Sequence, residues 1–379
     1  MTDLQNYLWS DKIKNAKVSL INEDLIKITL IDQDYINTLP ANKKKIFSNK
    51  IGQFGIELSH QAINCHFIQF LINTGDFYWY KYLNKITHKP ITDTRTLDNI
   101  LETNLHFVSK ITALGYLLHK FRNRSCEKAI IAMDGKNSEI GENNGRTGKS
   151  LLGYAIAKMI PQVYIPGKAK DFTEDRFIFE QVNEKTDNIF IDDTRPNFDF
   201  EFLFPVITGI LTVNAKGDKK FCLPAKLVPK IYITTNHAIN GNSDSFRDRQ
   251  SYICFSDYYN ANYKPINDFG LIFFDEWEKD QWNLFYNFMA FCLRTYFKFG
   301  LVSPPMEIVE KRRLRQSIGD DFITWADDYY GIIDEDSPNV VYGNNINIEI
   351  SRNEIYSNFF DKCPNQRKWV TASTIVEIY

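Results

Sequence analysis

Five short apolar segments, separated by longer and more polar stretches, dominate the middle of the chain. They are "KAIIAM" (128–133), "VYI" (163–165), "NIFIDD" (188–193), "KIYITTN" (230–236) and "YICF" (252–255). The central segments are apolar throughout rather than alternating, which is typical of strands covered on both faces. Strands that alternate with helices in this way predict an α/β fold with a mainly parallel sheet.

Composition and charge narrow the class of protein. The chain has 379 residues, of which 44% are hydrophobic, so a large core is expected. A net charge of −2 argues against a protein that coats DNA through bulk charge, but it permits a few lysines in a channel. The six scattered cysteines lack zinc-site spacing and indicate thiols of a reducing cytosol. Without a signal peptide or a membrane-length apolar run, a soluble cytoplasmic protein is expected.

A glycine-rich stretch, "GENNGRTGKSLLGYAIAKMI" (141–160), follows the first apolar segment. Its end matches the P-loop pattern G-x-x-x-x-G-K-[ST] at Gly148, Lys149 and Ser150, although Asn143 replaces the first glycine. Lys149 would neutralise phosphate charge and Ser150 would ligate Mg²⁺. The expected phosphate-binding residues are Asn144, Gly145, Arg146, Thr147, Gly148, Lys149, Ser150 and Leu151. The alternative is an ordinary strand-to-helix turn.

Polar residues at the ends of later apolar segments fit the same chemistry. Asp192 can hold Mg²⁺, and Asp193 can orient and help deprotonate an attacking water. Asn236 can position that water, and Arg249, or Arg247 beside it, can reach the γ-phosphate bound to a neighbouring subunit. Taken one at a time, these residues also read as exposed aspartates, a turn residue and a surface arginine pair.

These elements, in this order, make residues 105–300 resemble a superfamily 3 helicase of the AAA+ class. The resemblance is closer to the helicase module of phage and mobile-element primase–helicases. The family's B′ element, G-x-x-x-V-x-x-K, matches Gly209, Val213 and Lys216 in "TGILTVNAKGDKKF". The resemblance implies a hairpin in a central pore, where lysines contact single-stranded DNA. The implied DNA-binding residues are Lys216, Lys219 and Lys220; from the residues alone this would be a solvated hairpin.

Three domains are expected. They are a mixed α/β domain over 1–104, the ATPase domain over 105–300, and a helical, winged-helix-like unit over 301–379, the last by resemblance.

Local patterns add expectations about single elements. Residues 24–36 read as strand-rich, and "ANKKKIFSNK" (41–50) reads as an exposed loop. Helical spacing predicts a helix over 104–123 with Asn104 as its N-cap, and another over 274–300 that ends at Gly300.

The resemblance implies an ATP- and Mg²⁺-dependent DNA helicase or translocase of phage or mobile-element replication. It would act as a ring, most simply a hexamer, on single-stranded or forked DNA in the bacterial cytoplasm, with a primase or polymerase as a further partner. Lys149, Asp192, Asp193, Asn236 and Arg249 would be the catalytic residues. Two alternatives remain open: a replication loader or defence switch that does not unwind, and a DNA-binding module with a degenerate ATP site.

Overall fold

A computed structural model describes most of the chain in two compact units. The described residues are 18–19, 21, 25–92, 95–135, 145–169, 172–196, 198–217, 220–237, 239, 243–307, 309–310, 320–330 and 349–364. The first unit comprises residues 1–136 and 143–308, and the second comprises 309–379 with 137–142. The domain boundaries expected from the sequence stay predictions.

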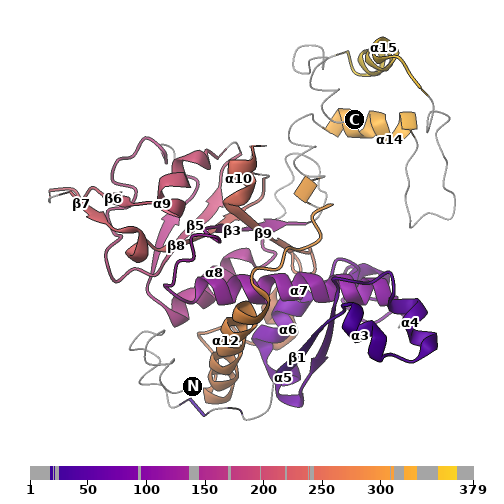
Figure 1. Cartoon of the computed structure of the whole chain (residues 1–379), viewed down its shortest axis with the longest axis horizontal. Coiled ribbons are helices and arrows are strands. Elements are labelled where there is room, and N and C mark those ends of the chain that lie inside the picture. Colours follow the sequence, from indigo (N-terminus) through magenta and orange to yellow (C-terminus); the bar gives the residue numbers. More distant parts are fainter. Residues whose placement is uncertain are drawn as a thin grey trace. The chain divides into compact units, whose positions relative to one another are not determined.

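A five-stranded parallel sheet forms the centre of the first unit (Figure 1). Its strand order is β4 (Gln162–Pro166), β5 (Asn188–Thr194), β8 (Lys230–Thr235), β3 (Ala129–Asp134) and β9 (Gln250–Phe255). Every neighbouring pair is parallel, and β3 and β8 are buried along their whole length. Each strand coincides with one of the five apolar segments, so the predicted α/β fold with a mainly parallel sheet is confirmed.

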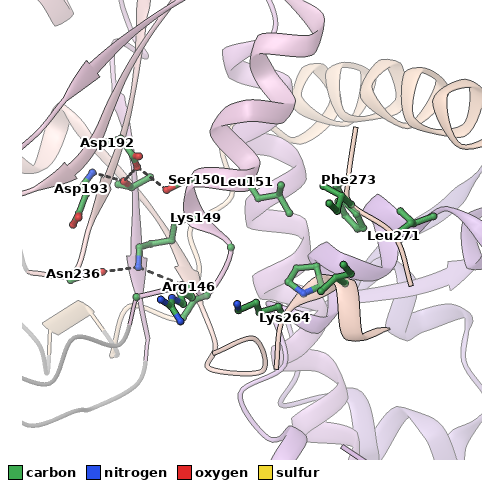
Figure 2. Close-up of a pocket in the computed structure, with 17 residues that line it drawn as sticks. Arg146, Lys149, Ser150, Leu151, Asp192, Asp193, Asn236, Lys264, Leu271 and Phe273 are labelled. Carbon is green, nitrogen blue, oxygen red and sulfur yellow. Dashed lines mark hydrogen bonds between the residues drawn. The ribbon is translucent and has the colours of Figure 1, made fainter. Parts of the chain in front are cut away.

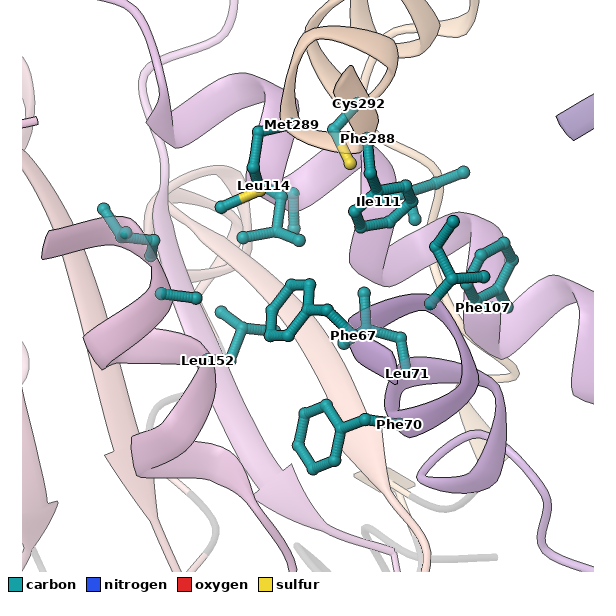
Figure 3. Close-up of a cluster of buried hydrophobic side chains, with 14 of the residues drawn as sticks. Phe67, Phe70, Leu71, Phe107, Ile111, Leu114, Leu152, Phe288, Met289 and Cys292 are labelled. Atoms are coloured by element: carbon teal, nitrogen blue, oxygen red, sulfur yellow. The ribbon is translucent and has the colours of Figure 1, made fainter. Parts of the chain in front are cut away.

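Helices from distant parts of the sequence build one hydrophobic core (Figure 3). The helices are α6 (His66–Asn73), α7 (Leu97–Leu117), α8 (Lys149–Met159) and α12 (Lys279–Phe299). Phe67 and Phe70 of α6 meet Leu114 of α7, Leu152 of α8 and Phe288 of α12, and all five side chains are fully buried. The N-terminal segment therefore shares its core with the sheet that follows it.

Close contact between α7 and α12 depends on Gly115. A Cβ atom at this position would lie 2.2 Å from the carbonyl oxygen of Cys292 and 2.6 Å from the Cβ of Tyr296. Because the obstructing atom at Cys292 is backbone, a side chain at residue 115 requires the two helices to move apart.

The helix predicted over 104–123 starts earlier than expected. In the structure α7 begins at Leu97, and Thr96 caps it by accepting a hydrogen bond from the Asn99 backbone N–H. Asn104 is therefore no N-cap; it lies inside the helix and donates to the carbonyl of Phe54. Threonine and asparagine are both good caps, and the polar residues of the first turns hid the helical period from the sequence pattern.

The remaining N-terminal elements differ in part from expectation. The strand-rich reading of 24–36 holds for β1 (Ile26–Leu30) alone, since α3 (Gln33–Thr38) follows it; β1 pairs with β2 (Phe54–Leu58) in antiparallel fashion. The expected loop at 41–50 contains helix α4 (Ala41–Phe47), because its lysines are good helix formers. Two short helices follow, α5 (His60–Asn64) and the 3₁₀ turn η1 (Trp79–Lys81).

Short elements fill the connections after the sheet strands. They are η2 (Glu201–Leu203), α9 (Phe204–Thr208), the antiparallel pair β6 (Leu211–Val213) and β7 (Phe221–Leu223), η3 (Ala225–Leu227), α10 (Asp244–Asp248) and α11 (Pro265–Phe269). The helix predicted over 274–300 is present as α12, which begins at Lys279 and ends at Phe299; Gly300, with φ of 70°, is its C-cap.

The second unit contains α14 (Asp320–Tyr330) and α15 (Arg352–Lys362), which bury Phe322, Trp325 and Phe359 between them. These two helices fit the predicted helical character, and the winged-helix-like arrangement stays a prediction, since much of 301–379 lies outside the described residues. No helix in the described part of the chain is long and apolar enough to cross a membrane. All six cysteines are free.

Replacing Gly115 by alanine is expected to destabilise the first unit, because the new methyl group collides with the backbone of α12. We expect the free energy of unfolding to fall by about 1–3 kcal/mol. Gly55→Ala is the matched control, since its Cβ would meet only ordinary contacts at 3.9 Å. Thermal unfolding midpoints of the two variants check this; equal midpoints would contradict the close packing.

Candidate nucleotide site

The glycine-rich loop joins the carboxyl end of β3 to the amino end of α8, at the edge of the sheet where all five parallel strands end. Gly148 adopts a φ of 102°, and a Cβ there would lie 2.6 Å from the ring of Phe70. Glycine alone satisfies both requirements. The backbone N–H groups at the start of α8 therefore face the pocket as an anion-binding helix end.

Lys149 points into the centre of this pocket (Figure 2). Its ammonium donates a hydrogen bond of 2.8 Å to the Asn236 side-chain oxygen, and it lies 2.5 Å from the carboxylate of Asp134. The Tyr232 hydroxyl donates to the Lys149 carbonyl at 2.8 Å, which ties the first turn of α8 to β8. The structure thus brings together Lys149 and Asn236, two residues that the sequence predicts for one site.

Asp134 was missed by the sequence analysis, although it is the last residue of β3. It is 1% exposed, and its Oδ1 accepts a 2.5 Å hydrogen bond from the Thr147 hydroxyl in addition to its contact with Lys149. Its Oδ2 is buried and has no hydrogen-bond partner among the described residues. Asp134 therefore braces the loop and holds the lysine through a single oxygen, and its partners lie more than ten residues away along the chain.

Ser150 and Asp192, the predicted Mg²⁺ ligands, lie side by side. The Ser150 hydroxyl donates to Asp192 Oδ1 at 2.8 Å, and the Thr234 hydroxyl donates to the same oxygen at 2.6 Å. Adjacent ligands of an octahedral Mg²⁺ are separated by ~2.9 Å, since Mg–O distances are about 2.0–2.1 Å. One carboxylate and one hydroxyl, completed by phosphate oxygens and water, suit Mg²⁺. The residues present therefore fit this ion.

Asp193 owes its position to an irregularity in β5. The register of β5 against β8 shifts between Ile191 and Thr194, and Asp193 has a φ of 59°, which is unfavourable for a residue other than glycine. Its backbone N–H donates to the Thr234 hydroxyl at 2.7 Å, and its carboxylate pairs with Lys168 at 2.6 Å. Backbone strain of this kind is often kept at functional sites. The bulge places two successive carboxylates in the lining of one pocket.

Tyr164 is a further neighbour of Asp192. Its hydroxyl donates to Asp192 Oδ2 at 3.3 Å, although 48% of the residue is exposed. Partial burial, together with the negative charge of Asp192, raises the pKa of Tyr164 to about 12. The phenol therefore remains a hydrogen-bond donor over the physiological pH range.

The opposite wall of the pocket is mostly apolar and, apart from Leu151, was not anticipated from the sequence. It consists of Leu151 and the segment after the last strand: Lys264, Pro265, Ile266, Leu271, Ile272 and Phe273. Figure 2 shows this wall facing the polar side chains across a cavity of about 630 Å³. Such a volume suits a nucleotide, with phosphates on the polar side and a base against the apolar wall.

A hydrogen-bond network anchors the apolar wall. Asp268 of α11 accepts hydrogen bonds from Tyr259 at 2.7 Å, from Asn73 at 3.2 Å, and from Tyr263. The carboxylate thereby joins α6, the segment after β9 and α11. The tyrosine-rich stretch "YYNANYKPIND" is a sequence signal that could have indicated this anchor. The sequence alone does not identify Asn73 as the partner of Asp268.

Gly145 and Arg146 also line the pocket, whereas the remaining predicted site residues lie elsewhere. Arg249 precedes β9 at the amino edge of the sheet; it donates to Ser245 at 2.6 Å and 2.7 Å and stacks on Phe204, outside the pocket of its own chain. Arg247 is exposed. Lys216 and Lys220 are exposed in the connection between β6 and β7. Asn144 and Lys219 lie outside the described residues.

Comparisons with known proteins place few constraints on the chain. No protein-family model matches it, and no curated protein does. The apo C-terminal region of NrS-1 matches with a TM-score of 0.35 and 16% identity, over 64% of this chain and 59% of that one. A structure of JCV helicase with a bound small molecule matches with a TM-score of 0.31 and 11% identity, over 77% and 80% of the two chains. TM-scores below 0.5 do not establish a shared fold or function.

Asp134→Asn is expected to make Mg–ADP bind several-fold more tightly. The amide still accepts from Thr147, but it no longer competes with phosphate for the ammonium of Lys149. Without ligand, the variant is expected to be less stable by about 1–3 kcal/mol, because a largely buried lysine loses its counter-ion. Calorimetric titration and thermal unfolding measure the two effects, with exposed Asp280→Asn as control. Weaker ADP binding with unchanged stability would contradict the role given to Asp134.

Proposed function

We propose that this chain is a Mg²⁺-dependent ATPase that moves along single-stranded DNA, as a helicase or translocase does. One observation carries the proposal. A phosphate-binding loop, a paired carboxylate and a strand-end asparagine converge on one cavity, where Lys149 contacts Asn236 and Ser150 contacts Asp192. An ordinary strand-to-helix turn requires none of these contacts.

Each polar residue has a role that follows from its position. Lys149 would neutralise the charge of the β- and γ-phosphates, once its ammonium is shared between phosphate and Asp134. A bound Mg²⁺, held by Ser150 and Asp192, would stabilise developing negative charge on the phosphates. Asp193 and Asn236 would then orient the attacking water from two sides.

The connection between β6 and β7 supports contact with a nucleic acid strand. Lys216 and Lys220 are exposed there, and Gly217 between them has a φ of 80°, which allows a tight turn. Because the whole chain has a net charge of −2, several copies arranged in a ring would be required to concentrate such lysines around one strand. In a ring, Arg247 is better placed than Arg249 to reach a neighbouring nucleotide, since Ser245 and Phe204 already hold the Arg249 guanidinium.

The two alternatives make different predictions. A loader or switch would hydrolyse ATP in response to DNA but would not displace a strand from a forked duplex. A DNA-binding module with a decayed ATP site would bind DNA equally well with and without ATP. The paired contacts of Lys149 and Ser150 favour a working site over a decayed one.

Lys149→Ala is expected to reduce steady-state ATP hydrolysis by at least about 100-fold, because a transition-state charge contact is lost. In the wild-type protein, single-stranded DNA is expected to stimulate turnover. Lys279→Ala, an exposed change in α12, serves as the control and is expected to leave both rates unchanged. Absence of wild-type turnover at concentrations where rings form would refute the ATPase.

Removing the two exposed lysines of the β6–β7 connection tests the strand contact separately. Lys216→Ala/Lys220→Ala is expected to abolish stimulation by DNA but to preserve basal hydrolysis, since neither residue lines the nucleotide pocket. Lys226→Ala, an exposed lysine of η3, is the nearby control. Equal stimulation of the wild type, the double variant and Lys226→Ala would contradict a role of the β6–β7 connection in strand binding.

A further inference from the structure

A second cationic segment lies between α6 and α7, well before the β6–β7 connection in the chain. Residues 77–95 read "FYWYKYLNKITHKPITDTR", with four lysine or arginine residues and one acidic residue. Apart from η1 and an isolated bridge between Leu83 and Pro90, the described part of this segment has no regular secondary structure. A loop of this length without secondary structure often serves a function.

Cations and aromatic rings are paired along this segment. Lys81 lies over the ring of Tyr78 at 4.8 Å, Lys85 over Tyr80 at 4.9 Å, and Arg95 over Tyr82 at 4.0 Å. Three of the nine such pairs among the described residues fall within this one segment. The pairs keep charged groups close to flat hydrophobic rings.

The Arg95–Tyr82 pair lines a groove of about 840 Å³. Ile91 and Ile100, which are 63% and 39% exposed, supply apolar surface. Asn73 and Tyr258 also line the groove. This volume is within the range of sites that hold small organic ligands or nucleotides. The groove therefore offers a guanidinium held beside apolar walls.

Among the described residues, three acidic side chains in and around this segment are buried or hydrogen-bonded within the protein. Asp76 is 5% exposed, and burial raises the pKa of its carboxyl to about 6, against the opposing effect of Arg95. Asp257 accepts from the indole of Trp79 at 2.9 Å, and Glu102 accepts from the hydroxyl of Tyr78 at 2.6 Å. Lys85 and Lys89, by contrast, are exposed, and Lys89 directly precedes Pro90, which lines the groove.

We propose that this groove binds single-stranded nucleic acid. A base would contact the apolar walls at Ile91 and Ile100, and the Arg95 guanidinium would donate to a phosphate. Lys85 and Lys89 would neutralise the next phosphates along the strand. Apolar or aromatic contact with bases, combined with cations along the backbone, is the usual chemistry of binding without sequence preference. An acidic peptide would satisfy the cations but would leave the exposed side chains of Ile91 and Ile100 without a matching group.

The groove adjoins the anchor of the nucleotide pocket, and this part of the inference rests on the proposed function. Asn73 lines the groove and also donates to Tyr259 at 3.1 Å and to Asp268 at 3.2 Å. Asp268 belongs to α11, whose residues Pro265 and Ile266 line the nucleotide cavity. A strand in the groove would therefore contact Asn73, one of the residues that position the apolar wall of the pocket.

Fluorescence anisotropy of the full chain with labelled oligo-dT and oligo-U, in the absence of nucleotide, tests the groove. Lys85→Ala/Lys89→Ala is expected to weaken binding about tenfold and to reduce the slope of log affinity against log salt by ~1.4, at ~0.7 per phosphate. Lys43→Ala/Lys45→Ala, two exposed lysines of α4, makes the same charge change outside the groove and is expected to have no comparable effect.

Arg95 provides a second, independent variant. Arg95→Ala is expected to weaken binding about tenfold, and Arg95→Lys to weaken it less, because the charge remains and the planar guanidinium is lost. Thermal unfolding identifies any variant that has lost its fold. If Arg95→Ala does not fold, the affinity of Arg95→Lys tests the contact between the guanidinium and the strand. Affinities and salt slopes that match those of the α4 control would overturn the groove, as would a poly-glutamate peptide that binds while both oligonucleotides do not.

The outcomes separate the groove from the proposed function. If groove variants bind the strand normally and DNA still stimulates hydrolysis, the groove is refuted and the ATPase translocase stands. If strand binding falls in the groove variants while the wild type shows no ATP hydrolysis, the groove is supported and the proposed function fails.

Discussion

The parallel direction of the five sheet strands is the constraint on which the site depends. Because every neighbouring pair is parallel, the carboxyl ends of β3, β5 and β8 meet at one edge. Residues that are separated by about a hundred positions, Asp134, Asp192 and Asn236, therefore line or brace one cavity. An antiparallel partner anywhere among these strands would move one of the polar groups to the opposite edge, where Arg249 lies.

Burial on both faces makes this arrangement stable. Strands β3 and β8 are buried along their whole length, and α6, α7, α8 and α12 supply apolar side chains to the core that includes residues of the sheet. The same packing supports the loop directly, since the Phe70 ring lies against Gly148. The glycine-rich loop is therefore shaped by the hydrophobic core beneath it as well as by its own glycines.

The features predicted correctly from the sequence are those that local residue patterns encode. Continuously apolar segments gave all five sheet strands, and the motif residues Lys149, Ser150, Asp192 and Asn236 do lie together. Contacts made only in space were missed: Asp134 has no motif of its own, and the wall at Lys264 to Phe273 depends on where α11 is anchored. The predicted start of α7 and the loop predicted where α4 lies were wrong, because caps and lysine-rich turns carry weak periodic signals.

Mg²⁺-dependent binding of a non-hydrolysable ATP analogue tests the central claim most directly. Calorimetric titration of the wild type and of Ser150→Ala, with and without Mg²⁺, measures whether the hydroxyl beside Asp192 belongs to a metal–nucleotide site. The account predicts that Mg²⁺ strengthens binding to the wild type about tenfold or more and has much less effect on Ser150→Ala. Absence of binding to the wild type, or equal Mg²⁺ dependence in the two proteins, would contradict it.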